Sequence, residues 1–398
     1  MRVLVVLPYG PTRTRVRARM LLEELTRTHQ VSIFALAWND DDREALEAWA
    51  DRGVSVRITA HTKLAVGRIA ITGPTRPLQR LVSTSPMLTQ AVRHELASAR
   101  AVGVPYDAVH IEHLRGAAAV DLLSGLGTRT VLDAVDCIAE LARLTREHST
   151  SLAARCLARA EEGPTRRFEA QLVQAVDAVT VVAERDRAAL AHGANGATID
   201  VIPNGVTRLP APVPLTGDPV VIFTGKLSYH ANQAAAQRLI DSIWPRVRAL
   251  LPDAQLRIAG ADAPRWLLRQ HGAQGIAIHD GPNDLTALIA DARVSVAPIV
   301  YSVGIQNKVL EAMACGVPVI ASPSAMDGLL TAARVALLGA DDDVEFARHI
   351  VRLLSDVSYA RSIGIAGYEY VAAHHSWPSV ARAFERLYLA PTWEEKAA

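Results

Sequence analysis

The feature that most constrains the fold is a regular alternation of short β-branched runs with longer amphipathic or alanine-rich segments. The first two runs are Arg2–Leu7 (RVLVVL) and Val31–Leu36 (VSIFAL), and a helical pattern over Val16–Thr28 lies between them. Apolar runs that are spaced by helices are typical of parallel strands buried on both faces of a sheet. The later runs of this series are Val54–Thr59, Ala108–His113, Thr130–Val135, Ala178–Ala183 and Ile199–Asn204. The alternation therefore predicts an α/β fold.

A proline-rich segment divides the alternation into two series. The segment from Pro203 to Pro219 also contains Pro210, Pro212 and Pro214, which is typical of a linker. The second series comprises Val220–Gly225, Gln255–Gly260, Ile276–Gly281, Val294–Ile299, Pro318–Ser322 and Val335–Gly339. We therefore expect two doubly wound domains, residues 1–205 and 206–375, that face each other across a deep cleft. A final amphipathic helix, residues 376–392, is expected to pack back on the first domain.

Composition narrows the classes of function. The 398 residues include 42 Lys+Arg and 41 Asp+Glu, so the net charge of +1 argues against a general nucleic-acid surface. The cysteines, Cys137, Cys156 and Cys315, have neither metal-site spacing nor the density of a disulfide scaffold, which favours a reducing, cytoplasmic setting. The opening apolar run is too short for a signal peptide, and no run approaches the roughly 18–20 residues of a membrane span.

Ligands of doubly wound sheets bind beyond the carboxyl ends of the strands, so candidate sites are sought there. The most informative segment is Gly304–Val319 (GIQNKVLEAMACGVPV), which follows the apolar run VSVAPI. We expect a helix that begins near Ile305, stops at Gly316 and is followed by a strand from Pro318.

The first turn of that helix has the chemistry of an anion site. Gln306, Asn307 and Lys308 fall where free backbone N–H groups and the helix dipole favour negative charge, and Lys308 adds a mobile cation. Glu311 lies on the same face as Lys308, one turn deeper. Its two oxygens suit the neighbouring hydroxyls of a ribose. This pattern predicts a clamp for a nucleoside diphosphate; a surface Lys–Glu pair is the plain alternative.

A second candidate site ends the first strand of the second domain. In the segment Phe223–Asn232, Gly225 permits a close approach of the backbone and Lys226 can reach a phosphate. Asn232 is predicted to cap the helix that follows. The alternative is a routine loop with a solvated lysine.

The first domain offers weaker candidates. After its first strand, Gly10 can let the loop approach a ligand, and Arg15 or Arg17 can bind an anion. This loop is neither a dinucleotide fingerprint nor a phosphate-binding Walker loop.

Two further strands of this domain end in polar residues. His110, Glu112 and His113 end one strand, and Asp133 and Asp136 end the next. At least one of each set is expected to face the cleft. A metal site is not expected, because the H-x-E-H sequence lies on a strand without a fourth ligand.

These motifs resemble those of glycosyltransferase family 4. The resemblance rests on Gly304–Val319, on Ile202–Val206 (IPNGV) and on Gly225–Leu227 (GKL) after a strand, and it extends over essentially the whole chain. The layout is similar to that of sugar transferases from bacterial exopolysaccharide clusters. It implies a GT-B fold of two facing Rossmann-like domains, with the nucleotide-sugar donor on the second and the acceptor on the first.

The resemblance also implies a reaction and its residues. It implies transfer of a sugar to a sugar, lipid-linked or natural-product hydroxyl, with retention of configuration and with no metal or cofactor. The implied catalytic residues are Glu112 and His113. The implied donor-binding residues are Gly225, Lys226, Gly304, Ile305, Gln306, Asn307, Lys308 and Glu311, and the residues expected near the acceptor or in the cleft are Gly10, Arg15, Arg17 and Asp136.

The sequence departs from the family pattern at three points. Val303 replaces a glutamate that many relatives carry eight residues before the motif glutamate, and Ala231 replaces a second basic residue. Gly10-Pro11 replaces the usual Gly-Gly of the first loop. Two other interpretations remain: a nucleotide-sugar 2-epimerase of the same fold and a non-catalytic nucleotide-sugar-binding protein. Peripheral membrane contact through the basic segment His61–Arg93 is a further hypothesis.

Overall fold

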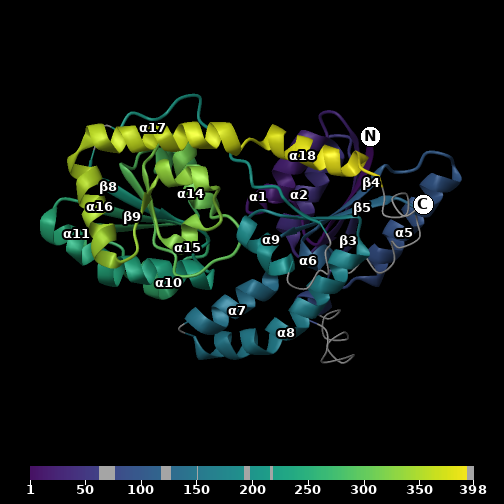
Figure 1. Ribbon diagram of the computed structural model, residues 1–398, viewed down its shortest axis with the longest axis horizontal. Helices are drawn as coiled ribbons and strands as arrows, with labels where there is room; N and C mark the ends of the chain where they lie inside the picture. Colours follow the sequence, from purple (N-terminus) through teal and green to yellow (C-terminus); the bar gives the residue numbers. More distant parts are fainter. Residues whose placement is uncertain (62–76, 118–126, 150, 192–197, 216–217, 392–398) are drawn as a thin grey trace. The chain divides into compact units, whose positions relative to one another are not determined.

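The computed structural model describes residues 1–61, 77–117, 127–149, 151–191, 198–215 and 218–391. The chain forms two compact units, each built on one parallel sheet (Figure 1). The first unit comprises 1–146, 153–203 and 377–398, and the second comprises 147–152 and 204–376. The short segment 147–152 thus belongs to the second unit, although the sequence analysis placed it in the first domain.

The first unit contains a seven-stranded sheet in the order β3-β2-β1-β4-β5-β6-β7. Its strands are β1 (Arg2–Leu7), β2 (Gln30–Ala37), β3 (Ser55–Ala60), β4 (Ala108–Glu112), β5 (Arg129–Val135), β6 (Ala178–Val181) and β7 (Ile199–Val201). Its described helices are α1 (Val16–Leu25), α2 (Asp40–Asp51), α4 (Leu78–Ser83), α5 (Pro86–Ala101), α6 (His113–Gly116), α7 (Ile138–His148), α8 (Leu152–Ala175), α9 (Glu184–Ala191) and α18 (Trp377–Leu389).

Both faces of this sheet are buried, as continuous apolar strands require. Along β1, Val3 and Val5 pack with α1, α2 and α18, whereas Leu4 and Val6 pack in the layer formed with α5, α8 and α9. Helix α18 is anchored through Phe384, which is fully buried. The last helix is therefore part of the core of the first unit.

The second unit contains a six-stranded parallel sheet in the order β10-β9-β8-β11-β12-β13. Its strands are β8 (Val220–Thr224), β9 (Gln255–Gly260), β10 (Ile276–Asp280), β11 (Val294–Ala297), β12 (Val319–Ala321) and β13 (Leu338–Gly339). Its helices are α10 (His230–Arg238), η3 (Leu239–Ile243), α11 (Trp244–Leu250), α12 (Arg265–Leu268), η4 (Ala273–Gly275), α13 (Leu285–Ala290), α14 (Asn307–Cys315), α15 (Pro323–Met326), η5 (Thr331–Val335), α16 (Asp343–Ser355) and α17 (Val357–His374).

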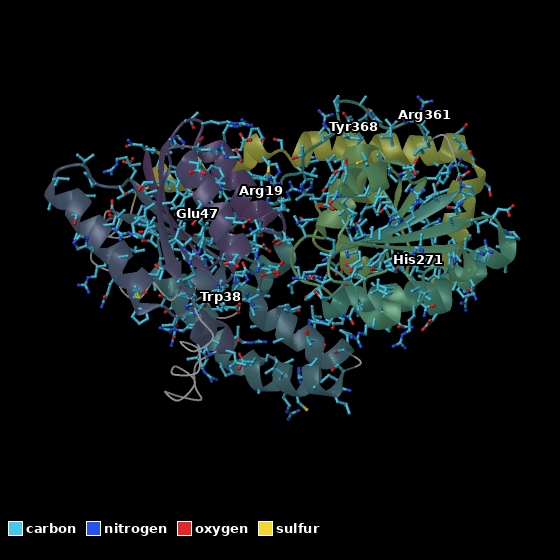
Figure 2. The ribbon with its side chains drawn as sticks, turned by 180° about the vertical axis from the view of Figure 1, so that it is seen from behind. Arg19, Trp38, Glu47, His271, Arg361 and Tyr368 are labelled. Atoms are coloured by element: carbon cyan, nitrogen blue, oxygen red, sulfur yellow. The ribbon has the colours of Figure 1, made fainter. Side chains whose placement is uncertain are left out.

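The proline-rich linker is packed against the second unit rather than free. Tyr368, labelled on α17 in Figure 2, donates its hydroxyl to the Leu209 carbonyl at 2.7 Å. The Arg208 guanidinium lies 4.5 Å from the centre of the Tyr368 ring. Val213 donates its backbone N–H to the carbonyl of Cys315, at the end of α14. The linker therefore forms part of the surface around α14 and α17.

The structure bears on two expectations, one about membrane-spanning helices and one about peripheral membrane contact. No helix within the described ranges has both the length and the hydrophobicity of a membrane span. Of the basic segment proposed for peripheral contact, Lys63, Arg68 and Arg76 lie outside the described residues. Arg80 is described, and its guanidinium lies 4.5 Å from the centre of the Phe168 ring.

Candidate functional site

In the second unit, the predicted donor residues lie at the point where the order of the strands in the sheet changes direction. Strands β8 and β11 are neighbours, and the chain proceeds from them to opposite edges of the sheet. Such a switch point leaves a crevice between the two loops that follow the strands. Gly225 and Lys226 follow β8, and the segment 304–308 follows β11 and leads into α14. Topology thus brings together two motifs that are about 80 residues apart.

Helix α14 begins at Asn307 with Gln306 as its N-cap residue, slightly later than the expected start near Ile305. Gly304 is left-handed, with φ of 63°, so the chain turns sharply into the helix. The Asn307 side chain accepts a hydrogen bond from Asn204 Nδ2 at 2.9 Å. Because Asn204 belongs to the IPNGV motif, this contact fixes the start of α14 to the linker.

Lys308 is a buried cation in the first turn of α14. Only 8% of the residue is exposed; its Nζ donates to Asn232 Oδ1 at 2.5 Å and lies 4.7 Å from the centre of the Phe223 ring. Burial lowers its pKa to about 7, and the Glu311 carboxylate opposes this shift in part. The expectation of a mobile lysine is therefore wrong: Lys308 is held in place before any ligand arrives.

Asn232 also differs from expectation. It does not cap α10, whose N-cap residue is Tyr229; instead its Nδ2 donates to the Lys226 carbonyl at 2.9 Å while its Oδ1 accepts from Lys308. A Cβ at Gly225 would lie 2.8 Å from Asn232 Nδ2 and 3.0 Å from Lys308 Nζ. Glycine is therefore needed at position 225 to admit these two side chains.

The remaining donor residues flank this buried cation. Glu311 follows one turn later on α14, and burial raises the pKa of its carboxyl group. Lys226 is a second cation at the same loop, with 58% of its side chain exposed and its Nζ 3.4 Å from Asp262 Oδ2. An exposed ion pair of this kind is weak, so an incoming phosphate can compete for Lys226.

In the first unit, β1 and β4 form the corresponding switch point. Glu112, at the end of β4, is 3% exposed, and its Oε1 accepts from the Tyr9 hydroxyl at 2.7 Å. Burial raises the pKa of Glu112 to about 7, and the Tyr9 hydrogen bond opposes this shift. Arg15 is exposed and covers the Tyr9 ring, with its guanidinium 4.1 Å from the ring centre. The sequence analysis did not single out Tyr9.

His113 follows Glu112 in a strained conformation. Its φ is 60°, and at the end of the neighbouring strand Val135 has φ of 69°. Left-handed backbone is costly for such residues and tends to occur at functional sites. The backbone N–H of Arg115 donates to His113 Nδ1 at 3.2 Å, and burial lowers the pKa of the imidazole to about 3. His113 is therefore neutral at pH 7 and carries its proton on Nε2.

Asp136 lies on the Nε2 side of His113. The distance from His113 Nε2 to Asp136 Oδ1 is 4.0 Å, and this oxygen is buried with no hydrogen-bond partner among the described residues. Burial, together with the nearby Asp186 and Glu169, raises the pKa of Asp136 to about 7. The structure thus brings together a neutral imidazole donor and a carboxylate that has hydrogen-bonding capacity to spare.

Two residues that were predicted to contact a ligand, Arg17 and Gly10, instead make contacts within the fold. Arg17 is 6% exposed, and its guanidinium forms two hydrogen bonds to Asp133, at 2.6 and 3.0 Å, so it does not present a free cation to an acceptor. A Cβ at Gly10 would lie 2.4 Å from the Asp42 carbonyl oxygen. Glycine at position 10 is thus explained by close packing against α2, and not by approach to a ligand.

Within the described ranges, no group of three or more His, Cys, Asp or Glu side chains is arranged to hold a metal ion. His110, a member of the H-x-E-H sequence, is buried, and its Nδ1 is 2.9 Å from the Tyr388 hydroxyl of α18. It therefore joins α18 to the sheet.

Comparison with solved structures gives the fold class. The structure of Anabaena HepE in complex with UDP is 15% identical, with a TM-score of 0.66, and the match covers 97% of this chain and 99% of the other. Sucrose-phosphate synthase from Thermosynechococcus elongatus is 18% identical, with a TM-score of 0.67 and 97% and 98% of the two chains covered. The two sheets and these neighbours define a GT-B fold.

Family models match both halves of the chain. Residues 15–208 match the model of "Glycosyltransferase Family 4" and residues 218–356 match that of "Glycosyl transferases group 1". The chain thus carries a glycosyltransferase family 4 domain followed by a glycosyl transferases group 1 domain. A D-inositol 3-phosphate glycosyltransferase from Mycolicibacterium vanbaalenii is 32% identical over 215 residues, and the alignment spans 46% of each of the two chains.

Proposed function

We propose that the protein is a retaining glycosyltransferase that moves a sugar from a nucleoside-diphosphate sugar to an acceptor hydroxyl without a metal ion. The observation that carries this proposal is Lys308, buried at the start of α14 and held by Asn232. Departure of a nucleoside diphosphate places negative charge on a β-phosphate oxygen. A fixed cation at a helix N-terminus stabilises that charge without reorganisation during the reaction.

The two units are proposed to divide the substrates. In the second unit, Lys308 and Lys226 bind the diphosphate and Glu311 binds the ribose hydroxyls. In the first, His113 Nε2–H donates to the transferred sugar and Asp136 accepts from the attacking hydroxyl. UDP is the first nucleotide to test, because the similar HepE structure contains it. All three cysteines are unpaired, which supports action in a reducing compartment such as the cytoplasm.

A thermal-shift panel of UDP, GDP and dTDP, each with and without a sugar, tests the donor site. We expect at least one nucleotide to raise the melting temperature, and Lys308→Ala and Glu311→Ala to abolish that shift. Incubation with the donor alone and with acceptors then separates three outcomes. A sugar epimerised without acceptor would indicate an epimerase, binding without turnover would indicate a binding protein, and no shift with any nucleotide would contradict the proposal.

The pH dependence tests the role of Asp136. With a pKa of about 7, its carboxyl group is mostly protonated at pH 6 and mostly ionised at pH 8. With the donor saturating, so that its diphosphate keeps Lys308 protonated, we expect kcat/KM for the acceptor to rise between these values, because only the ionised carboxylate can take the proton of the attacking hydroxyl. Asp136→Asn should remove the rise and lower the rate about 10²-fold or more. Glu112→Gln is the control: a rise that persists in Asp136→Asn and disappears in Glu112→Gln would assign it to Glu112.

A further inference from the structure

Asp136 lies on a strained turn that directly follows β5. Val135, the last residue of that strand, has φ of 69°, a left-handed conformation that is costly for a β-branched residue. Its carbonyl accepts from the backbone N–H of Val182 at 2.8 Å, and the N–H of Asp136 donates to the Ala134 carbonyl at 2.9 Å. A strained backbone of this kind persists only where the surrounding contacts hold it. The groups that hold the turn therefore determine where the Asp136 carboxylate lies.

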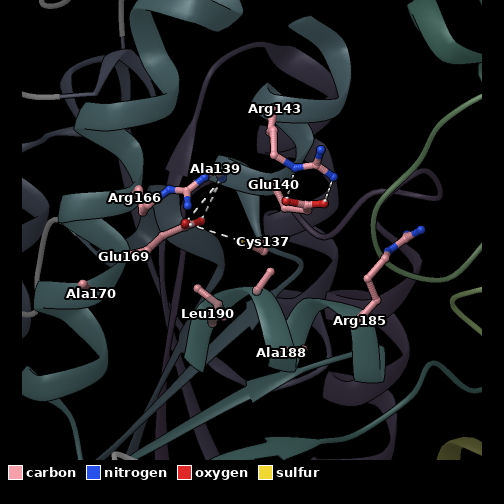
Figure 3. A pocket seen from close by; sticks show the side chains of 11 residues that line it. Cys137, Ala139, Glu140, Arg143, Arg166, Glu169, Ala170, Arg185, Ala188 and Leu190 are labelled. Carbon is pink, nitrogen blue, oxygen red and sulfur yellow. Dashed lines mark hydrogen bonds and ion pairs between the residues drawn. The ribbon is translucent and has the colours of Figure 1, made fainter. Parts of the chain in front are cut away.

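Two buried carboxylates bind the backbone immediately after this turn. Asp186, on α9, is fully buried and accepts from the backbone N–H of Cys137 at 3.0 Å. Glu169, on α8, is also buried and accepts from the N–H of Ile138 at 2.7 Å and from that of Ala139 at 3.3 Å. Figure 3 shows the Glu169 carboxylate pointing at the start of α7, with dashed lines to Ala139 and Cys137. Three successive N–H groups after the turn thus donate to carboxylates.

The same two carboxylates also act on Asp136 through their charge. The titratable and charged groups around Asp136 are three further carboxylates, one guanidinium and one imidazole, namely Asp186, Glu169, Asp133, Arg115 and His113. After burial, Asp186 and then Glu169 contribute most to the raised pKa of Asp136, whereas Arg115 opposes the shift. A neighbouring negative charge disfavours the ionised form of an acid, so it makes the ionised carboxylate a stronger base.

We propose that Glu169 and Asp186 are positioning residues for Asp136: they fix the turn that presents its carboxylate to the attacking hydroxyl, and their charge makes that carboxylate a stronger base. The inference rests on the proposed function, in which the proton of the attacking hydroxyl passes to Asp136. Both residues act only through Asp136 and exchange no proton with a substrate. Their position explains why the start of α7 is bound by two buried carboxylates, although neutral side chains also cap helices.

Amide variants separate the charge of these residues from their hydrogen bonds. In Glu169→Gln and Asp186→Asn, an amide oxygen can still accept from the backbone, but the negative charge is removed. We expect the pKa of Asp136 to fall by about half a unit or more in both, with the larger shift in Asp186→Asn. The titration is followed by NMR with carbon-13 in the aspartate carboxyl groups, and Asp136→Asn identifies the signal by its loss. This measurement requires neither a donor nor an acceptor.

The positioning of Asp136 is tested by the rate of UDP-glucose hydrolysis at pH 8, in which water takes the place of the acceptor. Glu169→Ala removes the oxygens that bind the start of α7, so we expect the rate to fall about tenfold or more. The dissociation constant of UDP should stay within about twofold, because the proposed donor site lies in the second unit. Glu169→Gln keeps an acceptor oxygen and should retain most of the rate.

The matched control is Glu184→Gln, also on α9. Glu184 is mostly exposed and pairs with Arg187, so this variant should leave the titration of Asp136 unchanged. The inference is overturned if Asp136 titrates at the original pH in both amide variants, if Glu184→Gln shifts it equally, or if Glu169→Ala hydrolyses UDP-glucose at the original rate. If UDP still binds in those cases, the proposed transferase function stands without these positioning residues. Failure of UDP to bind would instead count against that function.

Discussion

Replacing Lys308 by methionine is expected to lower the rate of sugar transfer by about 10²–10³-fold, the usual cost of losing one preorganised group that stabilises a developing charge. Methionine preserves most of the side-chain volume, so the contact with Phe223 and the packing of α14 should persist. The loss should appear in kcat as well as in the dissociation constant of UDP. Steady-state kinetics and calorimetric titration measure the two separately.

Two further variants provide a comparison for the loss expected in Lys308→Met. Asn232→Ala keeps the Lys308 amine but removes the acceptor of its 2.5 Å hydrogen bond, so a smaller loss is expected. Lys226→Met removes a cation that is more than half exposed, so binding of UDP should weaken less than in Lys308→Met. A Lys308→Met protein that folds normally and transfers sugar at the original rate would refute the role given to α14.

The sequence predicted the strands and the position of the candidate site residues at the strand ends, because both follow from local patterns. Continuous apolar runs mark buried parallel strands, and ligands of such sheets bind beyond their carboxyl ends. The local structure of Gly304–Val319 could therefore be predicted without knowing which residues contact this segment. Its glycine turn, helix and exit to a strand are set by residues close together in the chain.

The pairings between distant residues were not predictable in the same way. Lys308 meets Asn232 across 76 positions, and Tyr9 meets Glu112 across 103. A parallel sheet brings many strand ends to one edge, but the sequence pattern does not specify which of their side chains touch. Asn232 therefore looked like a helix cap.

Removing the Asp133 carboxylate is expected to destabilise the first unit by about 3–5 kcal/mol, because it takes from the buried Arg17 guanidinium the carboxylate to which it is hydrogen-bonded. Arg17 and Asp133 have side chains that are 5% and 1% exposed, and Thr180 donates a third hydrogen bond to Asp133 at 2.8 Å. The variant is Asp133→Ala. Equilibrium urea denaturation gives the free energy of unfolding, and hydrogen exchange in β1, β4 and β5 locates the loss in the first unit.

The Arg17–Asp133 pair also predicts how the stability of the first unit changes at acidic pH. Burial alone would raise the pKa of Asp133, but Arg17 and Thr180 lower it below its ordinary value. The stability from this group is therefore fully present above the pKa of unfolded Asp and is lost as pH falls through the lower, folded-state pKa. That acid-sensitive part should be absent from Asp133→Ala. The double variant Arg17→Met/Asp133→Leu should recover most of the lost stability, since it removes both buried charges. If the double variant is as unstable as Asp133→Ala, the uncompensated charge of Arg17 is not the cause.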